Sequence, residues 1–444
     1  MDYYILALVI LSVYWLFVLL LNSLGILERH NISTYGPILM IRTTRGQQFL
    51  DRLAAPKKFW NAFADVGIFA VALSMIFMFI FLIIEDYLIL RIKPGPTAFN
   101  EPRNILLLPG INQFIPLTWG IIALIVALIV HELAHALLTR AADIRLKAVG
   151  LVVVMLPVGA FAEPDESQLF GEESKDNGKI ATNRDRLRIE TAGIMGNFIV
   201  ALICLALFFG PVLSAIAPVP GLGVLSVVSG SPADTAGIRP GMTILQIDNT
   251  MIASDDQFHA FMNTTRPGQV ILVKAAEKGT SNEFTVTLSK NPNFNQGFLG
   301  VTGGSEETLN FLKQIPHTLN TIGGWMALLA LALVIFNGFT GDVVNLYHPI
   351  GWASHFGPGI FWIANTLLWV GWLNFYVGLF NSLPTVPLDG GHVFKRIFES
   401  IIGRLVKSIK LQALVTRVVT DILGVVVLAS FILLIVGPRI FGVI

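Results

Sequence analysis

Two histidines and a glutamate stand close together in the apolar segment IIALIVALIVHELAHALLTR, residues 121–140. His131 and His135 are four residues apart, so they share one face of a helix that turns every 3.6 residues. Two neutral imidazoles in this arrangement can hold two corners of a tetrahedral zinc ion, and Glu132 beside them can act as a general base toward a water molecule at the metal. The pattern predicts metal-assisted hydrolysis.

The apolar surroundings of these residues strengthen the prediction. Ionisable groups inside a membrane-spanning helix cost about 2.5 kcal/mol or more each, and those that are retained usually serve a function. A polar cluster that only holds helices together is the alternative. Arg140 lies about 13 Å along the helix from His131, so we expect the metal below the membrane surface.

A third ligand is needed, and Asp389 in FYVGLFNSLPTVPLDGGH is the best candidate. Two prolines and a Gly-Gly pair break the helix there, and broken helices at membrane depth occur where protein or a water-filled cavity satisfies their polar groups. Two alternatives remain: Asp389 caps the following helix, or His392 is the ligand instead.

Composition places the chain in a membrane, because 54% of its residues are hydrophobic and only 13% are charged. The formal net charge of +1 gives no basic excess for a phosphate backbone, so we expect no nucleic-acid partner. Cys204 is the single cysteine and lies in an apolar run, which predicts a buried structural thiol.

The predicted fold is a membrane α-helical bundle with an inserted β-rich domain. Its apolar runs predict about six spanning helices. They lie at residues 3–26, 66–90, 115–139, 189–217, 360–380 and 418–441. We expect the run at 3–26 to be a retained anchor, since no basic region precedes it. The borderline run at 322–338 is predicted to be re-entrant or peripheral.

Loop charges predict the orientation of the chain. Lys and Arg crowd the loops at 29–58, 140–186 and 395–417, so we expect these loops to face the cytoplasm. The active site then lies toward the cytoplasmic side of a multi-pass protein of the cell membrane. Residues 219–303 change to short β-rich stretches with Gly, Pro, Asn and Asp between them, and this domain is expected outside the cytoplasm.

Residues 149–166, VGLVVVMLPVGAFAEPDE, are rich in β-branched residues but too short to span. They predict a strand pair that dips into the membrane. Glu163 and Asp165 within it are interpreted more simply as surface acids.

Taken together, these motifs resemble the site-2 protease family of intramembrane zinc metalloproteases. HELAH at 131–135 is similar to its zinc-binding helix, NSLPTVPLDGG at 381–391 to its second signature, and AGIMGNF at 192–198 to its Gly-x-x-x-Asn element. The resemblance implies one zinc ion per chain, with Asp389 as third ligand. It also implies that Asn197 and Asn381 bind substrate backbone or the developing oxyanion; without it, Asn197 would be an interhelical hydrogen bond.

The family implies transmembrane protein substrates, whose unwound segment could pair with the edge of the strand pair at 149–166. It also implies a PDZ domain, which SVVSGSPADTAGIRPGMTILQIDNTMI at 226–252 resembles. Such domains bind peptide C-termini through a loop of backbone amides. This loop is predicted at Gly297, Phe298, Leu299, Gly300 and Val301, with residues 221–224 as the competing assignment. A domain that is only a spacer is the alternative.

The predicted organisation has four parts: two additional N-terminal transmembrane helices at 1–92, the first half of the protease core at 93–218, the PDZ-like domain at 219–303, and the second half of the core at 304–444.

Other functions explain fewer of these sequence features. An aspartyl protease using Asp342 leaves the histidines unexplained, no Gly-x-Ser-x-Gly motif supports serine chemistry, and no internal repeat supports a transporter. A non-catalytic scaffold or chaperone-like protein needs neither Glu132 nor metal.

Overall fold

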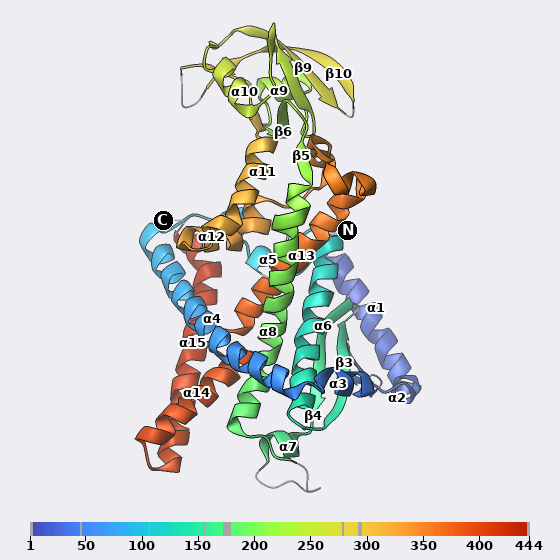
Figure 1. Ribbon diagram of the computed structural model, residues 1–444, viewed down its shortest axis with the longest axis vertical. Helices are drawn as coiled ribbons and strands as arrows, with labels where there is room; N and C mark the ends of the chain where they lie inside the picture. The colour runs from blue at the N-terminus through green and yellow to red at the C-terminus, as the bar shows by residue number, and fades with distance from the viewer. Residues whose placement is uncertain are drawn as a thin grey trace. The chain divides into compact units, whose positions relative to one another are not determined.

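The computed structural model describes residues 3–44, 47–105, 107–154, 156–171, 179–277, 279–291 and 295–441. These residues form two compact units, labelled by element in Figure 1. Unit 1 comprises residues 1–113, 120–202 and 373–444, and unit 2 comprises residues 114–119 and 203–372.

Unit 1 is mainly helical. Its helices are α1 (Tyr3–Ser23), α2 (Ile26–Arg29), α3 (Gln47–Ala54), α4 (Lys57–Ile92), η1 (Ala98–Asn100), α5 (Pro102–Ile105), α6 (Leu117–Ala141), α7 (Glu166–Phe170), α14 (Asp389–Leu405) and α15 (Ile409–Phe441). Three long helices are divided between the units: α8 (Asn183–Leu207), α13 (Gly359–Asn381) and α6, whose residues 117–119 belong to unit 2.

Five helices among the described residues are long and apolar enough to cross a membrane. They are α4, α6, α8 with its continuation η2 (Phe208–Val212), α13 and α15. Each coincides with a predicted span, so the chain is an integral membrane protein. The described apolar part of α1, Val9–Ser23, is shorter, and a crossing at 3–26 stays a prediction. The run at 322–338 forms only a short apolar helix, Ile322–Leu333.

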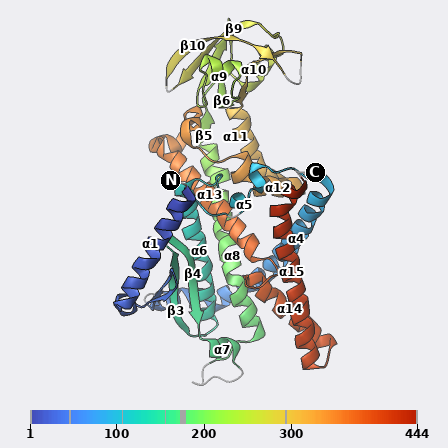
Figure 2. The same cartoon turned by 180° about the vertical axis from the view of Figure 1, so that it is seen from behind.

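A four-stranded antiparallel sheet lies beside α6 in unit 1 (Figures 1 and 2). Its strands, in spatial order, are β1 (Ile32–Tyr35), β2 (Ile38–Thr43), β3 (Leu146–Val154) and β4 (Leu156–Pro164). The strand pair predicted at 149–166 is therefore present, although Met155 between the strands lies outside the described residues. Sequence analysis did not predict β1 and β2, which a turn with Gly36 at φ +63° connects.

Small and branched side chains attach this sheet to α6. Leu146 of β3 forms a buried cluster with Leu50 of α3 and Ala136 of α6, and Val149 and Ala162 pack against it. Because Ala136 directly follows His135, the sheet is held next to the helix that carries the two histidines.

A second cluster joins α4, α8 and α14. Val71 and Met75 of α4 pack with Ile194 and Met195 of α8 and with Val393 of α14. Helices α14 and α15 also lie side by side with α4 in both views (Figures 1 and 2). The helix that begins with Asp389 is thus packed against α8, the helix that carries the AGIMGNF motif.

Unit 2 contains the β-rich domain and the segments on either side of it. Its strands are β5 (Ile216–Pro218), β6 (Leu222–Val227), β7 (Thr243–Ile247), β8 (Thr250–Met251), β9 (Val270–Glu277), β10 (Thr280–Thr287), β11 (Ser289–Lys290), β12 (Gly297–Phe298), β13 (Val301–Gly303) and β14 (Tyr347–Pro349). Its remaining helices are η2, α9 (Pro232–Ala236), α10 (Asp255–Met262), α11 (Ser305–Gln314), η3 (Ile315–Thr318), α12 (Ile322–Ala330), η4 (Leu331–Ile335), η5 (Gly341–Leu346) and η6 (Gly351–Phe356).

The main sheet of unit 2 has the strand order β10-β9-β7-β6-β13, and β8 pairs with β7. Alternation explains β9, where Ile271, Val273 and Ala275 face the core and the residues between them face outward. The core is closed by residues such as Ile244 and Ile247 of β7. Within the described residues, β13 is an edge strand and β6 is an internal one.

Candidate metal centre

Helix α6 presents two imidazoles side by side. The apolar run favours a continuous helix, and the four-residue spacing puts His131 and His135 one turn apart on one face. Their rings lie 4.9 Å apart between centroids, and the two Nε2 atoms are 3.3 Å apart. The helix therefore aims two nitrogen ligands at one point.

Asp389, the first residue of α14, completes the cluster. Its Oδ2 lies 3.0 Å from His131 Nε2 and 3.1 Å from His135 Nε2. A tetrahedral zinc ion with bonds of about 2.0–2.1 Å separates its ligand atoms by roughly 3.3 Å, so the observed triangle has the size that such an ion requires. His392 is not a member of the converging group. The geometry favours Asp389 over His392 as third ligand.

The cluster is largely buried, but each of its side chains keeps some exposure to solvent. The side chains of His131, His135 and Asp389 retain 11%, 15% and 22% of their exposure. Burial acts to raise the pKa of Asp389, but the two imidazoles, when they are protonated and donate from Nε2, outweigh it and hold the pKa of this carboxyl below its usual range. Asp389 is therefore ionised, as a metal ligand must be.

Helix α8 fixes the orientation of His135. The Nδ1–H of His135 donates to the carbonyl oxygen of Ile189 at 2.7 Å. A proton held at Nδ1 leaves the lone pair on Nε2, the atom that faces Asp389. The residues thus preset the imidazole form that binds metal.

Asn197 does the same for His131. The Asn197 side chain is fully buried. Its Nδ2 lies 3.3 Å from His131 Nδ1, and its Oδ1 has no partner among the described residues. Since amide orientation is assigned from hydrogen bonding, turning the group by 180° lets Oδ1 accept from Nδ1–H. That turn satisfies the orphaned oxygen and frees His131 Nε2 for a metal.

Gly193 makes room beside the two Nε2 atoms. A Cβ built on Gly193 would lie 2.4 Å from His135 Nε2 and 2.6 Å from His131 Nε2, far inside ordinary contact distance. Only glycine leaves this space free. The donor set, the preset imidazoles and the glycine cradle all fit a zinc ion.

Glu132 is held by the neighbouring sheet. Its Oε2 accepts a hydrogen bond from the backbone N–H of Ala162 in β4 at 2.9 Å. Ala162 is paired with Val149 of β3 in the strand register, but its backbone N–H points away from β3 and toward Glu132. Within the described residues β4 is an edge strand, and its outer edge faces Glu132.

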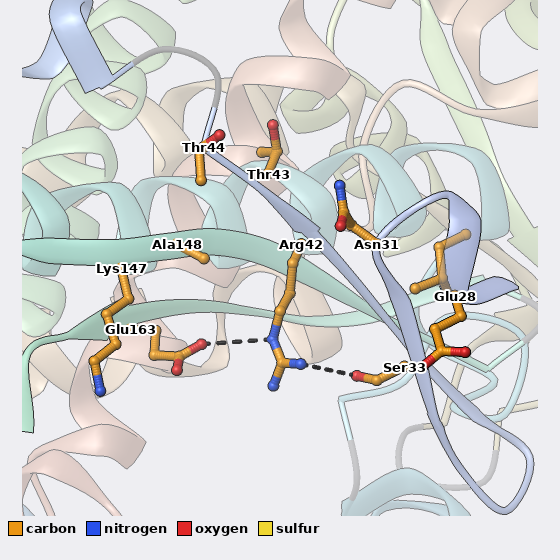
Figure 3. Close-up of a pocket in the computed structure, with 10 residues that line it drawn as sticks. Glu28, Asn31, Ser33, Arg42, Thr43, Thr44, Lys147, Ala148 and Glu163 are labelled. Carbon is orange, nitrogen blue, oxygen red and sulfur yellow. Dashed lines mark hydrogen bonds and ion pairs between the residues drawn. The ribbon is translucent and has the colours of Figure 1, made fainter.

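A shallow polar pocket of about 590 Å³ lies on the sheet, apart from the metal cluster (Figure 3). It is lined by Glu28, Asn31, Ile32, Ser33, Arg42, Thr43, Thr44, Lys147, Ala148 and Glu163. Figure 3 shows Arg42 between Ser33 Oγ, at 3.1 Å, and Glu163 Oε2, at 3.5 Å. Because Glu163 follows Ala162, these contacts hold the part of β4 that contacts Glu132.

The remaining predicted residues are less closely tied to the site. Asn381 ends α13 and is partly exposed, and its role stays a prediction. Asp165 caps α7 by accepting from the Ser167 amide at 3.0 Å, as expected for a surface acid. Two contributors were not predicted: the carbonyl of Ile189 and the cradle at Gly193. Gly193 lies within the AGIMGNF motif, where a glycine inside a helix is itself a signal, because it destabilises the helix by roughly 0.5–1 kcal/mol relative to Ala.

The predicted peptide-binding loop lies in unit 2. The carbonyls of Leu299 and Gly300 accept from the amides of Ala233 and Val228, and Val301 begins the edge strand β13. Gly300 has φ +88°, and a Cβ there would meet Ser231. The competing assignment at 221–224 falls at the internal strand β6, which has neighbours on both sides.

Comparison with known proteins points in one direction. The model of peptidase family M50 matches residues 119–426, which include all three clustered ligands. An uncharacterised protein of Methanocaldococcus jannaschii is 26% identical over 371 residues, covering 83% of this chain and 80% of the relative. A putative zinc metalloprotease of Clostridium perfringens is 26% identical over 351 residues, covering 70% of this chain and 96% of the relative.

Among solved structures, the PDZ domain of an SdrC-like protein from Listeria monocytogenes is 18% identical. It covers 21% of this chain and 96% of its own, with a TM-score of 0.19. A TM-score this low does not assign a fold, so the PDZ domain stays a prediction.

Proposed function

The chain belongs to peptidase family M50, and on this premise we propose that it is an intramembrane zinc endopeptidase that cleaves membrane-protein substrates within or near their transmembrane segments. The observation that carries the proposal is the convergence of His131 Nε2, His135 Nε2 and Asp389 Oδ2 within 3.0–3.3 Å of one another. These atoms come from two helices, and His135 and Asp389 are 254 residues apart in the sequence. Such a triangle has no evident purpose in an apolar bundle except to hold a metal.

Three residues would hold one zinc ion: His131, His135 and Asp389. When bound, zinc polarises the scissile carbonyl and makes water a nucleophile at neutral pH. Glu132 accepts the proton of the attacking water and then delivers it to the leaving amine. Asn197 and Ile189 keep the proton of each histidine on Nδ1, so that both Nε2 atoms remain ligands.

The outer edge of β4 is the proposed substrate-binding strand. A helical substrate hides its carbonyl groups in its own hydrogen bonds and must unwind before water can attack one. An unwound segment can add to an exposed strand edge through backbone hydrogen bonds. The Ala162 amide lies on this edge and touches Glu132, so a substrate paired there runs past the general base.

Asn381 is the better candidate for a contact with substrate or the developing oxyanion. Asn197 is fully buried against His131. Its side-chain oxygen, which otherwise has no partner among the described residues, can accept from His131 and so orient that ring. Asn381 is partly exposed at the end of α13, where the broken segment to Asp389 begins. We therefore assign the two asparagines different roles.

The loop charges support an active site toward the cytoplasmic side of the cell membrane and a β-rich domain on the other side. We propose that this domain is a PDZ domain that receives peptide C-termini at residues 297–301. The free edge of β13 supports this assignment over 221–224, because strand addition needs an unpaired edge.

Metal analysis and cleavage test the proposal together. The purified protein should contain about one zinc ion per chain, and His131→Ala should lose it. Glu132→Gln should keep the metal but lose cleavage, so single-span proteins that accumulate with this variant but not with wild type are the substrates. A Glu132→Gln variant with normal cleavage would contradict the mechanism.

A further inference from the structure

A buried ion pair joins α8 to α14 close to the three proposed ligands. Arg396 Nε donates to Glu190 Oε1 at 2.5 Å, and the two side chains keep only 16% and 15% of their exposure. The Arg396 guanidinium also lies over the Phe170 ring, 5.7 Å from its centroid. The mechanism proposed above uses neither charge.

Both members of the pair lie on helix faces that serve the site. Arg396 follows Asp389 by seven residues, about two turns of α14, so both side chains lie on one face of that helix. Glu190 directly follows Ile189, whose carbonyl orients His135. The pair therefore connects α14, which begins with Asp389, to α8, which contacts His135 of α6 through the Ile189 carbonyl.

Close backbone contacts hold the start of α14, but a second contact is needed to stop the helix from rotating about its axis. A Cβ on Gly390 would lie 2.4 Å from the carbonyl carbon of Ser382, and one on Gly391 would lie 2.4 Å from that of Thr385. These contacts fix where the helix begins. A small rotation about the helix axis would still carry the Asp389 carboxylate away from the Nε2 atoms, and a contact two turns away opposes such a rotation.

Stability alone does not explain a charge pair at this position. Taking two charges out of water is costly, and buried ion pairs are often no more stabilising than apolar residues of similar volume. Glu190 Oε2 is in addition buried without a partner among the described residues. What such a pair provides, and an apolar contact does not, is a fixed direction and distance between two helices.

We propose that Glu190 and Arg396 are positioning residues that fix the rotation and height of α14, and so keep Asp389 Oδ2 at ligand distance from both imidazoles. This inference rests on the proposed metal ligands. The pair touches neither substrate nor reacting atoms and acts through Asp389.

Zinc affinity of the full-length protein in detergent tests this role without requiring proteolysis. Arg396→Gln and Glu190→Gln should each weaken zinc binding by about tenfold in competition with a chelator, the lower end of the 10–100-fold loss seen when a group bonded directly to a metal ligand is removed. The visible spectrum of the cobalt-substituted protein should also change, because it reports the ligand geometry. The double variant Glu190→Arg with Arg396→Glu should recover much of both properties.

A second ion pair on α8 is the matched control. Arg188 Nη2 contacts Asp65 Oδ2 at 2.8 Å and joins α8 to α4 instead of α14. Asp65→Asn should lower thermal stability and leave the zinc affinity and cobalt spectrum unchanged. Should a Gln variant fail to accumulate in membranes, Arg396→Lys keeps the charge without the Nε donor and should give intermediate zinc affinity.

Two results would overturn the proposal: wild-type zinc affinity and cobalt spectra in the Arg396 and Glu190 variants, or an equal loss of zinc affinity in Asp65→Asn. Wild-type affinity in Arg396→Lys, where it replaces a Gln variant, would also contradict it. Failure of the proposed function has a different signature, a wild-type protein that binds no zinc, and this is measured before any variant is compared.

Discussion

Replacing Gly193 by alanine is the sharpest test of the metal centre, because one methyl group would enter the space beside both histidines. The added Cβ would lie 2.4 Å from His135 Nε2, whereas ordinary contacts begin at 3.4 Å. Either the imidazole or α8 must therefore move by about 1 Å. Metal–ligand distances tolerate only about 0.2 Å, so the ligand triangle cannot survive this shift unchanged.

The expected effect is large and opposite in sign to helix propensity. Alanine is about 1 kcal/mol more favourable than glycine inside a helix, so α8 itself should gain stability. A displacement of about 1 Å at a reactive centre costs about 100-fold in activity. We expect zinc affinity to fall by a similar factor, which corresponds to about 2.8 kcal/mol. Competition with a chelator measures the affinity, and hydrolysis at saturating zinc measures what activity remains.

Gly196 provides the matched control on the same helix. A Cβ there would lie 2.9 Å from the Ala134 Cβ and 3.3 Å from Val130 Cγ1, so its nearest neighbours are not imidazole atoms. Gly196→Ala should therefore disturb packing between α6 and α8 with less than about a tenfold loss of zinc affinity. Zinc affinity and hydrolysis at wild-type levels in Gly193→Ala would refute the cradle and the ligand geometry built on it.

Three further predictions concern residues around the centre and in the β-rich domain. Asn197→Asp should keep zinc, because a carboxylate also accepts from His131 Nδ1–H, while Asn197→Leu should lose about 10–100-fold in zinc affinity. A chelator titration compares the two variants, and equal zinc affinities would contradict the role of Asn197 in orienting His131. Ala162→Pro should keep the zinc content, because proline is tolerated at a strand edge. It should slow cleavage of a membrane substrate, because it removes the N–H that contacts Glu132, and an unchanged cleavage rate would contradict a role for this contact. Burial, together with neighbouring acids, raises the pKa of Asp255, so its ionised form destabilises the folded domain at pH values above that raised pKa. Asp255→Asn should slow hydrogen exchange in residues 219–303 at neutral pH, and the difference should vanish in acid as the wild-type carboxyl is protonated in both states; equal exchange at neutral pH would count against the shift.

The sequence predicted the metal ligands because the membrane makes ionisable residues conspicuous. Each ligand is a polar side chain in or beside a long apolar run, and the penalty for such residues argues for a function. The same runs predicted five helices that can span, since length and hydropathy decide that property. The span count remains open at α1, whose described apolar part is shorter, and at 322–338, where a re-entrant or peripheral segment stays a prediction.

Features that depend on distance between segments were not predictable in this way. The Ile189 carbonyl orients His135, but every residue has a carbonyl, so nothing in the sequence marks this one. Arg396 and Glu190 are 206 residues apart, and their pairing follows from packing. Strands β1 and β2 were not predicted, because they lie within the basic loop at 29–58, although Gly-Pro between two branched stretches is typical of a hairpin.

Helix α8 supplies none of the three ligands, yet it contacts both histidines and is joined by an ion pair to the helix that carries Asp389. In order along the helix, the Ile189 carbonyl holds His135, Glu190 holds the helix of Asp389 through Arg396, and Asn197 holds His131. Ile189 and Glu190 lie about two turns from Asn197, and Gly193 between them leaves the space that the ligands share. A ligand set drawn from two distant segments needs a common reference, and one rigid helix can provide it. We therefore expect substitutions on this face of α8 to change zinc affinity more than substitutions of equal volume on its other faces.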